Sequence, residues 1–204
     1  MVMRWDVLNH IAKRIGARRY LEIGVADGSC IRRIDVVEKW GIDPTPSVES
    51  VTSTSVFVPM TSEAFFERIA PNAGKFDLVF IDGDHVAEKV LVEIASASRI
   101  LTPQGVIVLH DCNPHTEAMQ AVPYTGGEWT GDVWKAVARL RRAGYTLRVI
   151  NSDYGIGVLV PTLPTQQLPL DADELTWNHL AAHRDVLLGL IEPWDWESWF
   201  NSLR

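Results

Sequence analysis

The sequence predicts an α/β protein built on one mainly parallel sheet with helices on both faces. Short apolar runs alternate along the chain with helix-like segments, which is the pattern of βαβ crossovers. The strand-like runs are apolar throughout, as expected for strands that are buried on both faces. The last two runs are joined by only Ser152 and Asp153, which is too short for a crossover, so they are expected to pair as an antiparallel hairpin.

The elements are expected in the following order. Strands are predicted over 17–24, in a segment ending at 41–43, and over 55–59, 76–82, 105–111, 145–151 and 154–160. Helices are predicted within 29–40 and over 62–70, 87–101 and 133–144, followed by a proline-spaced linker at 161–171 and two further helices. Pro103 and Gly105 are expected to form the turn before the fifth strand, and Gly144 to end the helix before the hairpin.

The composition excludes some classes of partner. A chain of 204 residues is long enough for one sizeable domain, expected over 1–204 with a core of about 15–160 and a helical extension of about 171–204. The 26 acidic residues outnumber the 19 basic ones, and the net charge of −7 opposes nucleic acid as a partner. The cluster of Arg139, Arg141, Arg142 and Arg148 is expected to be the solvated face of a helix, with anion binding as the alternative.

The cysteines and the hydropathy pattern indicate the cellular context. Cys30 and Cys112 make no disulfide framework and no paired-cysteine zinc pattern. No stretch approaches the roughly 18 apolar residues of a membrane span, and the first ten residues lack a secretory h-region. We therefore expect a cytoplasmic protein with no membrane partner.

The junctions after the first two predicted strands suggest a small-ligand site. In an open α/β sheet, ligands bind beyond the carboxyl ends of the strands. The first junction, residues 22–28, has glycines at Gly24 and Gly28 that allow a tight turn and a close approach of the backbone to a ligand. Ala26 breaks the dinucleotide fingerprint G-x-G-x-x-G. Asp43, after the second strand, is placed to accept hydrogen bonds from ribose hydroxyls, with a turn or helix-cap role as the alternative.

The pattern E-x-G-x-x-x-G after the first strand, an acid after the second, an aspartate after the fourth and the terminal hairpin together resemble a class I S-adenosylmethionine-dependent methyltransferase. The resemblance covers about residues 15–160 and implies a Rossmann-like seven-stranded methyltransferase sheet with S-adenosylmethionine (SAM) as the cofactor. The hairpin separates this fold from NAD-binding Rossmann domains. The residues that the resemblance assigns to the cofactor are Glu22, Gly24, Ala26, Gly28, Asp43, Thr61, Ser62 and Asp82, with Thr61 and Ser62 at the adenine.

Two neighbouring strands end in a carboxylate with an imidazole nearby. The fourth ends in Asp82, followed by His85, and the fifth ends in His110 and Asp111. Two buried carboxylates side by side are unfavourable unless a cation or a proton offsets their charge. The pattern is similar to the metal-dependent sugar O-methyltransferases of macrolide and aminocoumarin biosynthesis. In that family the aspartate after strand four is a metal ligand, an acidic pair follows strand five, and the histidine is the proposed base in some members.

The resemblance and the chemistry of these side chains give the expected site. The catalytic candidates are His85, Asp111 and His110, and the metal candidates are Asp82, Asp111 and His110. His110 stands where the family has an acid, and its imidazole favours manganese over magnesium. The alternatives are that His110 lies hydrogen-bonded in the core and the enzyme works without metal through His85 alone, that Asp82 binds the amino group of the cofactor or a loop amide, and that Asp84 caps a helix.

Two further segments carry expectations about the acceptor. The loop at 113–131, with His115, Tyr124 and Trp129, is predicted to be a substrate-binding lid that ends where Asp132 caps the next helix, with a disordered surface excursion as the alternative. In the tail, the spacing of Trp196, Trp199, Phe200 and Leu203 predicts a helix with one apolar face. That face is expected to dock on its own domain, with a homodimer contact or a wall of the acceptor pocket as the alternatives.

The predicted function is SAM-dependent O-methylation of a small hydroxylated acceptor, such as a sugar or a secondary metabolite, with assistance from a divalent cation, manganese or magnesium. Two other functional classes compete with it. A nicotinamide-dependent oxidoreductase is opposed by the glycine spacing and the terminal hairpin. A non-catalytic protein with a cofactor-binding fold is opposed by the acidic and imidazole residues at both strand ends.

Overall fold

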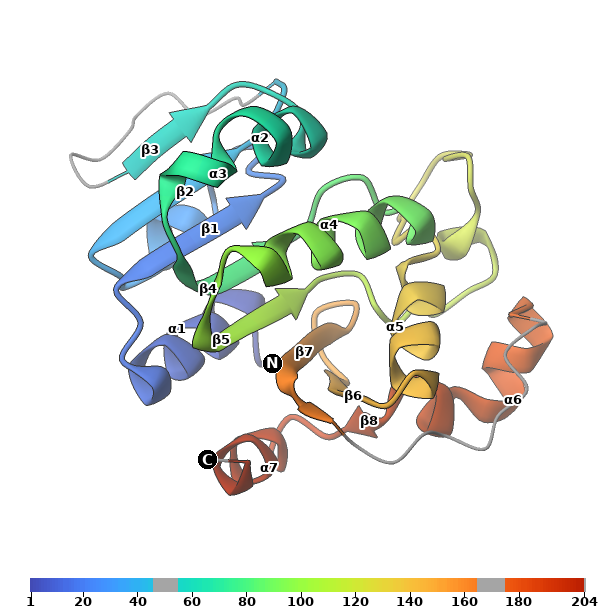
Figure 1. Cartoon of the computed structure of the whole chain (residues 1–204). Helices are drawn as coiled ribbons and strands as arrows, with labels where there is room; N and C mark the ends of the chain where they lie inside the picture. The colour runs from blue at the N-terminus through green and yellow to red at the C-terminus, as the bar shows by residue number, and fades with distance from the viewer. Residues whose placement is uncertain (46–54, 165–174, 204) are drawn as a thin grey trace. The chain divides into compact units, whose positions relative to one another are not determined.

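A computed structural model describes residues 1–45, 55–164 and 175–203 of the chain (Figure 1). Its eight strands form one sheet in the order β3-β2-β1-β4-β5-β7-β6-β8. The strands are β1 Arg19–Ile23, β2 Glu38–Ile42, β3 Ser55–Val58, β4 Phe76–Ile81, β5 Leu101–Leu109, β6 Tyr145–Ile150, β7 Ile156–Pro164 and β8 Leu190–Ile191. The pairs β1–β2, β1–β4 and β2–β3 are parallel, and β6–β7 is antiparallel. The fold class, the seven predicted strands and the terminal hairpin are therefore confirmed, and the two-residue β8 adds an unpredicted eighth.

The Cα positions group into two compact units. The N-terminal unit comprises Arg4–Asp84 and Glu88–Val108, and the C-terminal unit comprises Met1–Met3, His85–Ala87 and Leu109–Arg204. The helices of the first are α1 Arg4–Ile15, η1 Ile31–Arg33, α2 Ser62–Arg68, α3 Ala70–Ala73 and α4 Ala87–Arg99, which joins the two units at its first residue. Those of the second are η2 Ala118–Gln120, α5 Val133–Arg142, α6 Trp177–Leu188 and α7 Trp196–Ser202. A single domain over 1–204 stays a prediction.

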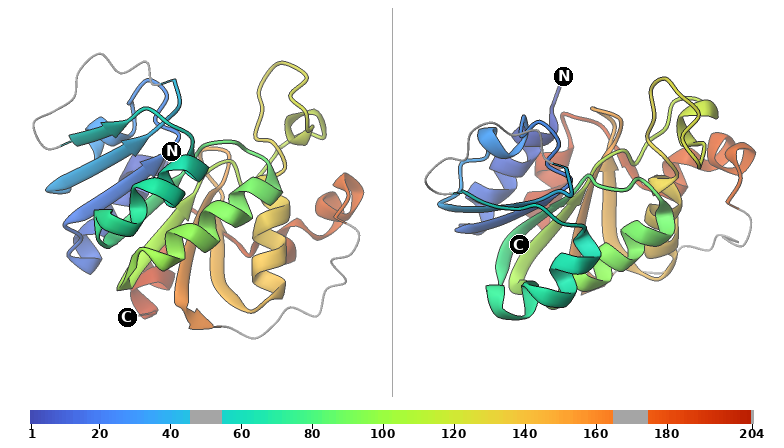
Figure 2. Two further views of the ribbon diagram at one scale, coloured as in Figure 1. Left: turned by 45° about the horizontal axis from the view of Figure 1, so that its top comes forward. Right: turned by 90° about the horizontal axis from the view of Figure 1, so that it is seen from above.

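In the N-terminal unit, helices cover both faces of strands β1 to β5. Helix α1 lies on one face, and α2, α3 and α4 lie on the other (Figure 2). Helix α1 packs on β4 with its buried side chains Val7, Leu8, Ile11 and Ala12. This helix was not predicted, although the spacing of these four residues is that of one apolar helical face.

In the C-terminal unit, α5 packs against β6 and α6. One side of α5 is buried through Trp134, Val137 and Leu140. The tail ends in α7, where Trp196 is 2% and Phe200 0% exposed, so the predicted apolar helical face exists. None of the helices within the described ranges combines the length and apolarity that a bilayer span requires.

Several element boundaries differ from those predicted. The short helix predicted within 29–40 is a single 3₁₀ turn, η1. The Lys39 ammonium donates hydrogen bonds to the carbonyl oxygens of Ile31 and Ile34 at 3.0 and 3.1 Å, and this ends the helix. Strand β5 begins at Leu101, since the Thr102 hydroxyl donates to Asp77 of β4 at 3.1 Å. The residues expected to form a turn there, Pro103 and Gly105, therefore lie within the strand.

The arginine cluster is not simply a solvated face. The Arg141 guanidinium donates to the backbone carbonyl oxygens of Leu147 and Val186. Burial, followed by the nearby charge of Arg148, lowers the pKa of Arg141 to about 10. Residues 161–164 of the predicted proline-spaced linker belong to β7, which ends at Pro164. Residues 165–171 of the linker are outside the described part of the chain.

Candidate active site

Gly24 lies where two strands of the N-terminal unit approach each other closely. The Gly24 amide donates to Ile42 O at 2.9 Å, and the Asp82 amide donates to Ile23 O at 2.8 Å. The φ of Gly24 is +86°, and a Cβ there would stand 2.1 Å from the Asp82 carbonyl oxygen. Only glycine fits this position. The first glycine of the predicted loop therefore brings the carboxyl ends of β1 and β4 together.

Asp43 binds the glycine loop itself. Its Oδ2 accepts a hydrogen bond from the Ala26 amide at 2.9 Å, and its Oδ1 accepts one from the Thr45 amide at 2.8 Å. The φ of Ala26 is +46°, a left-handed conformation that a non-glycine residue adopts only when its surroundings hold it there. Asp43 therefore acts as a turn residue, which was the alternative prediction, and it also orders the loop. Its role at the ribose stays a prediction.

Glu22 is buried beneath this loop with a polar partner. It is 1% exposed, and its Oε2 accepts a hydrogen bond of 2.5 Å from the Tyr20 hydroxyl. Burial raises the pKa of Glu22 to about 8, the Tyr20 hydrogen bond opposes this rise, and the nearby Asp82 adds to it. The side chain is therefore largely an uncharged carboxylic acid at neutral pH.

Thr61 and Ser62, predicted at the adenine, have partners in the N-terminal unit. The Thr61 hydroxyl accepts a hydrogen bond from the Ala64 amide at 3.3 Å and caps α2. The Ser62 hydroxyl donates to Glu93 Oε1 of α4 at 2.6 Å. Both hydroxyls thus have a structural role, and contact with the cofactor at these positions stays a prediction.

Asp82, directly after β4, is paired with a cation from the N-terminal helix. The Arg4 guanidinium donates to Asp82 Oδ2 at 2.7 Å, and the two side chains are 22% and 16% exposed. Arg4 therefore compensates part of the carboxylate charge for which a metal was predicted. The sequence reasoning missed Arg4 because it missed α1.

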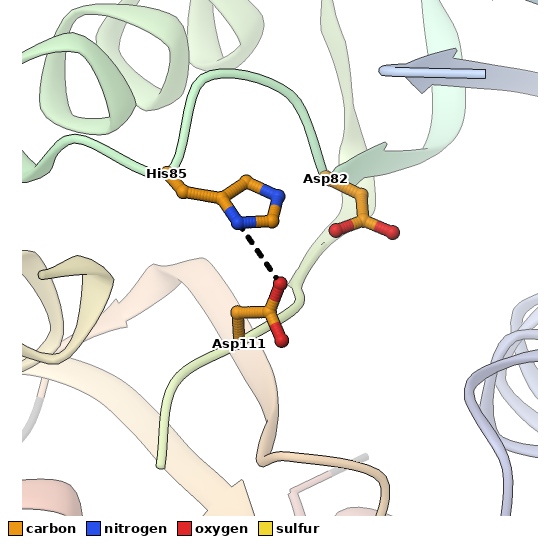
Figure 3. A group of neighbouring side chains, drawn as sticks. All are labelled: Asp82, His85 and Asp111. Carbon is orange, nitrogen blue, oxygen red and sulfur yellow. Dashed lines mark ion pairs between the residues drawn. The ribbon is translucent and has the colours of Figure 1, made fainter. Parts of the chain in front are cut away.

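His85 is held by three contacts within the C-terminal unit. Its ring stacks on Trp129, with centroids 5.1 Å apart and an interplanar angle of 17°. Its Nδ1 lies 3.1 Å from Asp111 Oδ2 (Figure 3). Its backbone carbonyl accepts a hydrogen bond from the Asp132 amide at 3.1 Å, and a Cβ on Gly131 would stand 1.9 Å from that carbonyl oxygen. The end of the predicted lid loop thus fixes the backbone of His85.

Asp132 caps a different helix from the one expected. Its side chain makes no capping hydrogen bond to α5. Its Oδ1 instead accepts a hydrogen bond of 2.7 Å from the Ala87 amide, at the start of α4, and its Oδ2 pairs with Lys135 at 3.0 Å. The prediction for Asp132 was therefore wrong about the helix, and this residue supports the segment that carries His85.

The structure groups Asp82, His85 and Asp111, each of which offers one possible ligand atom within 4.8 Å of the others (Figure 3). This group differs from the predicted metal ligands because it contains His85 and not His110. The side chain of His110 is 3% exposed and lies between two carboxylates, with Nδ1 3.1 Å from Asp111 Oδ1 and Nε2 3.5 Å from Asp153 Oδ2. The metal role of His110 stays a prediction, and in this structure both of its ring nitrogens face carboxylates.

The sheet order, the terminal hairpin and the glycine loop are those of the Rossmann-like methyltransferase fold. A family model described as a methyltransferase domain matches residues 21–112, the stretch that runs from β1 through the segment after β5. No curated protein sequence matches the chain.

Solved structures share this fold at low sequence identity. The O-methyltransferase TomG from Streptomyces achromogenes, involved in tomaymycin synthesis and in complex with SAM, is 18% identical with a TM-score of 0.59, covering 80% of each chain. The SAH-bound methyltransferase PaMTH1 of Podospora anserina is 16% identical with a TM-score of 0.57, covering 78% of this chain and 79% of its own. The mycinamycin-pathway methyltransferase MycE, in complex with Mg, SAH and mycinamycin VI, is 17% identical with a TM-score of 0.51, covering 82% of this chain and 49% of its own.

Proposed function

We propose that this methyltransferase transfers the methyl group of SAM to a hydroxyl oxygen of a small acceptor, a sugar or another secondary metabolite. The observation that carries the proposal is His85, whose Nδ1 lies 3.1 Å from Asp111 while its ring stacks on Trp129. An imidazole oriented by a carboxylate is suited to remove a proton from a hydroxyl group. The similarity to TomG supports oxygen as the acceptor atom, since TomG is an O-methyltransferase.

The cofactor supplies an electrophilic methyl group on a sulfonium. The glycine loop fits such a ligand, because Gly24 and Gly28 have positive φ values and leave the backbone unobstructed by side chains. Asp43 holds the loop through the Ala26 amide. We assign the ribose hydroxyls to the carboxylate oxygens of Asp43, which keep acceptor capacity beyond these two hydrogen bonds.

In the proposed reaction, His85 accepts the acceptor's proton. Because Nδ1 faces Asp111, Nε2 is the nitrogen that takes the proton, and the Asp111 carboxylate stabilises the imidazolium that forms. SAM, held by the glycine loop and Asp43, would supply the methyl group, which would pass to the acceptor oxygen as its bond to sulfur breaks. Trp129 holds the imidazole plane, which keeps the base aligned with the hydroxyl.

Assistance by a divalent cation is a second candidate, supported by the group of Asp82, His85 and Asp111 and by the magnesium in the MycE structure. Two carboxylates and one imidazole are donors that suit manganese better than magnesium. Arg4 already compensates part of the charge of Asp82. We therefore rank the metal-independent reaction first.

Calorimetric titration with SAM, S-adenosylhomocysteine and NAD tests the cofactor. We expect the first two to bind and NAD not to bind. A panel of hydroxylated sugars and phenols with methyl-labelled SAM then tests transfer. His85→Ala is expected to keep SAM affinity and to lose roughly 10²–10⁴-fold in turnover, the range of a general base. The exposed His183 provides the matched control in His183→Ala, and normal turnover by His85→Ala would remove His85 from the mechanism.

Chelation separates the two candidates. Turnover that survives exhaustive treatment with EDTA supports His85 acting without metal. Turnover that is lost and then restored by manganese supports the cation-assisted reaction, in which His85 is a ligand.

A further inference from the structure

The C-terminal unit contains a line of four alternating imidazoles and carboxylates. His85 Nδ1 lies 3.1 Å from Asp111 Oδ2, Asp111 Oδ1 lies 3.1 Å from His110 Nδ1, and His110 Nε2 lies 3.5 Å from Asp153 Oδ2. The side chains of Asp111, His110 and Asp153 are 7%, 3% and 5% exposed, and that of His85 is 18% exposed. Only the His85 end of this line therefore has appreciable contact with solvent. The mechanism proposed above uses only the first pair.

The backbone is strained at three of the four positions. The φ values of His85, Asp111 and Asp153 are +50°, +58° and +49°, in the left-handed region that non-glycine residues rarely adopt. Such a conformation costs of order 1–3 kcal/mol and persists only where the surroundings hold it in place. His85 and Asp111 lie in the segments that follow β4 and β5, and Asp153 lies in the turn between β6 and β7, where a change of φ redirects the side chain. The strain coincides with the members of the line.

The β6–β7 turn that carries Asp153 is fastened to the segment that follows Asp111. The Cys112 amide donates to Gly155 O at 3.0 Å, and the Asn113 amide donates to Tyr154 O at 2.8 Å. A Cβ on Gly155 would stand 2.5 Å from the Asn113 amide nitrogen, so the two backbones are in direct contact. The place of Asp153 relative to His110 and Asp111 is thus set by the backbone.

We propose that Asp153 is a positioning residue for the methyl-transfer site, acting through His110 on Asp111 and His85. A carboxylate beside Nε2 keeps the His110 ring in the orientation in which Nδ1 faces Asp111. Asp111, bounded by His110 on one oxygen, then presents the other oxygen to His85. This inference rests on the proposed function for its meaning, and it assigns a role to the hairpin turn that links the last two strands.

The test follows the ring nitrogens of histidine by NMR in protein labelled with ¹⁵N-histidine. The chain has only 6 histidines, so loss of signals in His85→Gln and His110→Gln assigns the two rings. In Asp153→Asn we expect the ring signals of both His110 and His85 to shift, and in Asp153→Glu we expect them to return toward the wild-type values. The matched control is Asp185→Asn, an exposed position in the same unit, which should leave both rings unchanged.

Two outcomes would overturn the proposal. His85 signals that stay at the wild-type position in Asp153→Asn, while those of His110 move, would show that the influence ends at His110. If Asp153→Asn does not fold, His110→Gln provides the test instead. His85 signals that stay at the wild-type position in His110→Gln would show that His110 does not influence the His85 ring. With an identified acceptor, Asp153→Asn should lower kcat about tenfold, in the range found for outer positioning partners, with an unchanged KM for SAM.

The NMR measurement requires no methyl transfer. A failed SAM titration with shifted His85 signals would therefore reject the proposed function and keep the positioning by Asp153. Unshifted His85 signals with normal SAM binding would reject the positioning by Asp153 and keep the proposed function.

Discussion

At the scale of single residues, two carboxyl groups of the N-terminal unit show how burial changes the role of an acid. Asp43 is partly exposed, and each of its two carboxylate oxygens accepts a hydrogen bond from a backbone amide, so it is suited to order a loop. Glu22 is buried and bonded to a phenol hydroxyl, and burial raises its pKa to about 8. The sequence predicted both as cofactor-binding residues. It could not predict their difference, because burial depends on packing that residue spacing does not report.

Asp43→Ala is expected to weaken SAM binding at least tenfold, which corresponds to about 1.4 kcal/mol. The substitution removes the acceptor for the Ala26 amide and leaves the left-handed Ala26 without its support. Calorimetry measures the affinity, and circular dichroism checks the fold. Asp35→Ala, at an exposed aspartate of the same unit, should bind SAM normally. Equal affinity in both variants would exclude Asp43 from the cofactor site.

Glu22 should make the stability of the protein fall as pH rises. Its pKa is about 8 in the folded chain, against an ordinary value of 4.5, so between these values the folded chain holds a proton that the unfolded chain has lost. Folding is therefore progressively disfavoured from about pH 4.5 to about pH 8, by up to a few kcal/mol. Glu22→Gln cannot ionise and keeps an acceptor for Tyr20.

Urea unfolding at pH 5.5 and pH 8.5 checks this expectation. As pH rises from 5.5 to 8.5, the free energy of unfolding of the wild type should fall relative to that of Glu22→Gln. Parallel pH profiles for the two proteins would show that Glu22 is already ionised in the folded state.

At the scale of elements, the strand ends were more predictable than the segments between them. The apolar runs identified β1 to β7, because a strand buried on both faces needs apolar residues at every position. The amphipathic α1 was missed, and with it Arg4, the partner of Asp82. The metal prediction followed from two carboxylates without visible compensation. Arg4, the group that compensates Asp82, is far away in the sequence, where strand-end patterns do not reveal it.

Gly24→Ala tests whether the close approach of β1 and β4 requires glycine. The new Cβ would stand 2.1 Å from Asp82 O, whereas a Cβ at Gly126 would meet nothing within 4 Å. Both glycines have positive φ, +86° and +105°, so both variants share a strain of roughly 1–2 kcal/mol. The additional clash at Gly24 should lower the free energy of unfolding by a further 2 kcal/mol or more, roughly the upper range for single substitutions.

Denaturant unfolding of the two variants measures this difference directly. We also expect Gly24→Ala to bind SAM more weakly than Gly126→Ala, because the loop backbone must shift. Equal stability of the two variants would mean that the strand ends can separate without loss.

At the scale of the whole molecule, the sequence predicted the class of protein better than it predicted the surface on which the C-terminal tail packs. The strand order follows from the crossovers and the hairpin, which are local features. The position of the tail depends on which surface its apolar face covers, and three alternatives were open. In the folded chain Trp196 and Phe200 are 2% and 0% exposed, whereas Trp194 is 75% exposed. The buried pair favours docking within the chain over a contact between two copies.

Phe200→Ala should therefore destabilise the protein by about 3–5 kcal/mol, the usual effect of removing a buried aromatic ring. Trp194→Ala removes a larger but exposed ring, and its stability should stay within about 0.5 kcal/mol of the wild type. Because a helix docked within one chain unfolds independently of concentration, the unfolding midpoint of Phe200→Ala should be the same at micromolar and at hundred-micromolar protein. Light scattering on the folded variants gives the mass of the particle. Two results together would instead identify the tail as a contact between two copies of the chain. These are an unfolding midpoint of Phe200→Ala that rises with protein concentration and a particle mass of Trp194→Ala that differs from that of the wild type. The homodimer contact, one of the original alternatives, would then be the better interpretation.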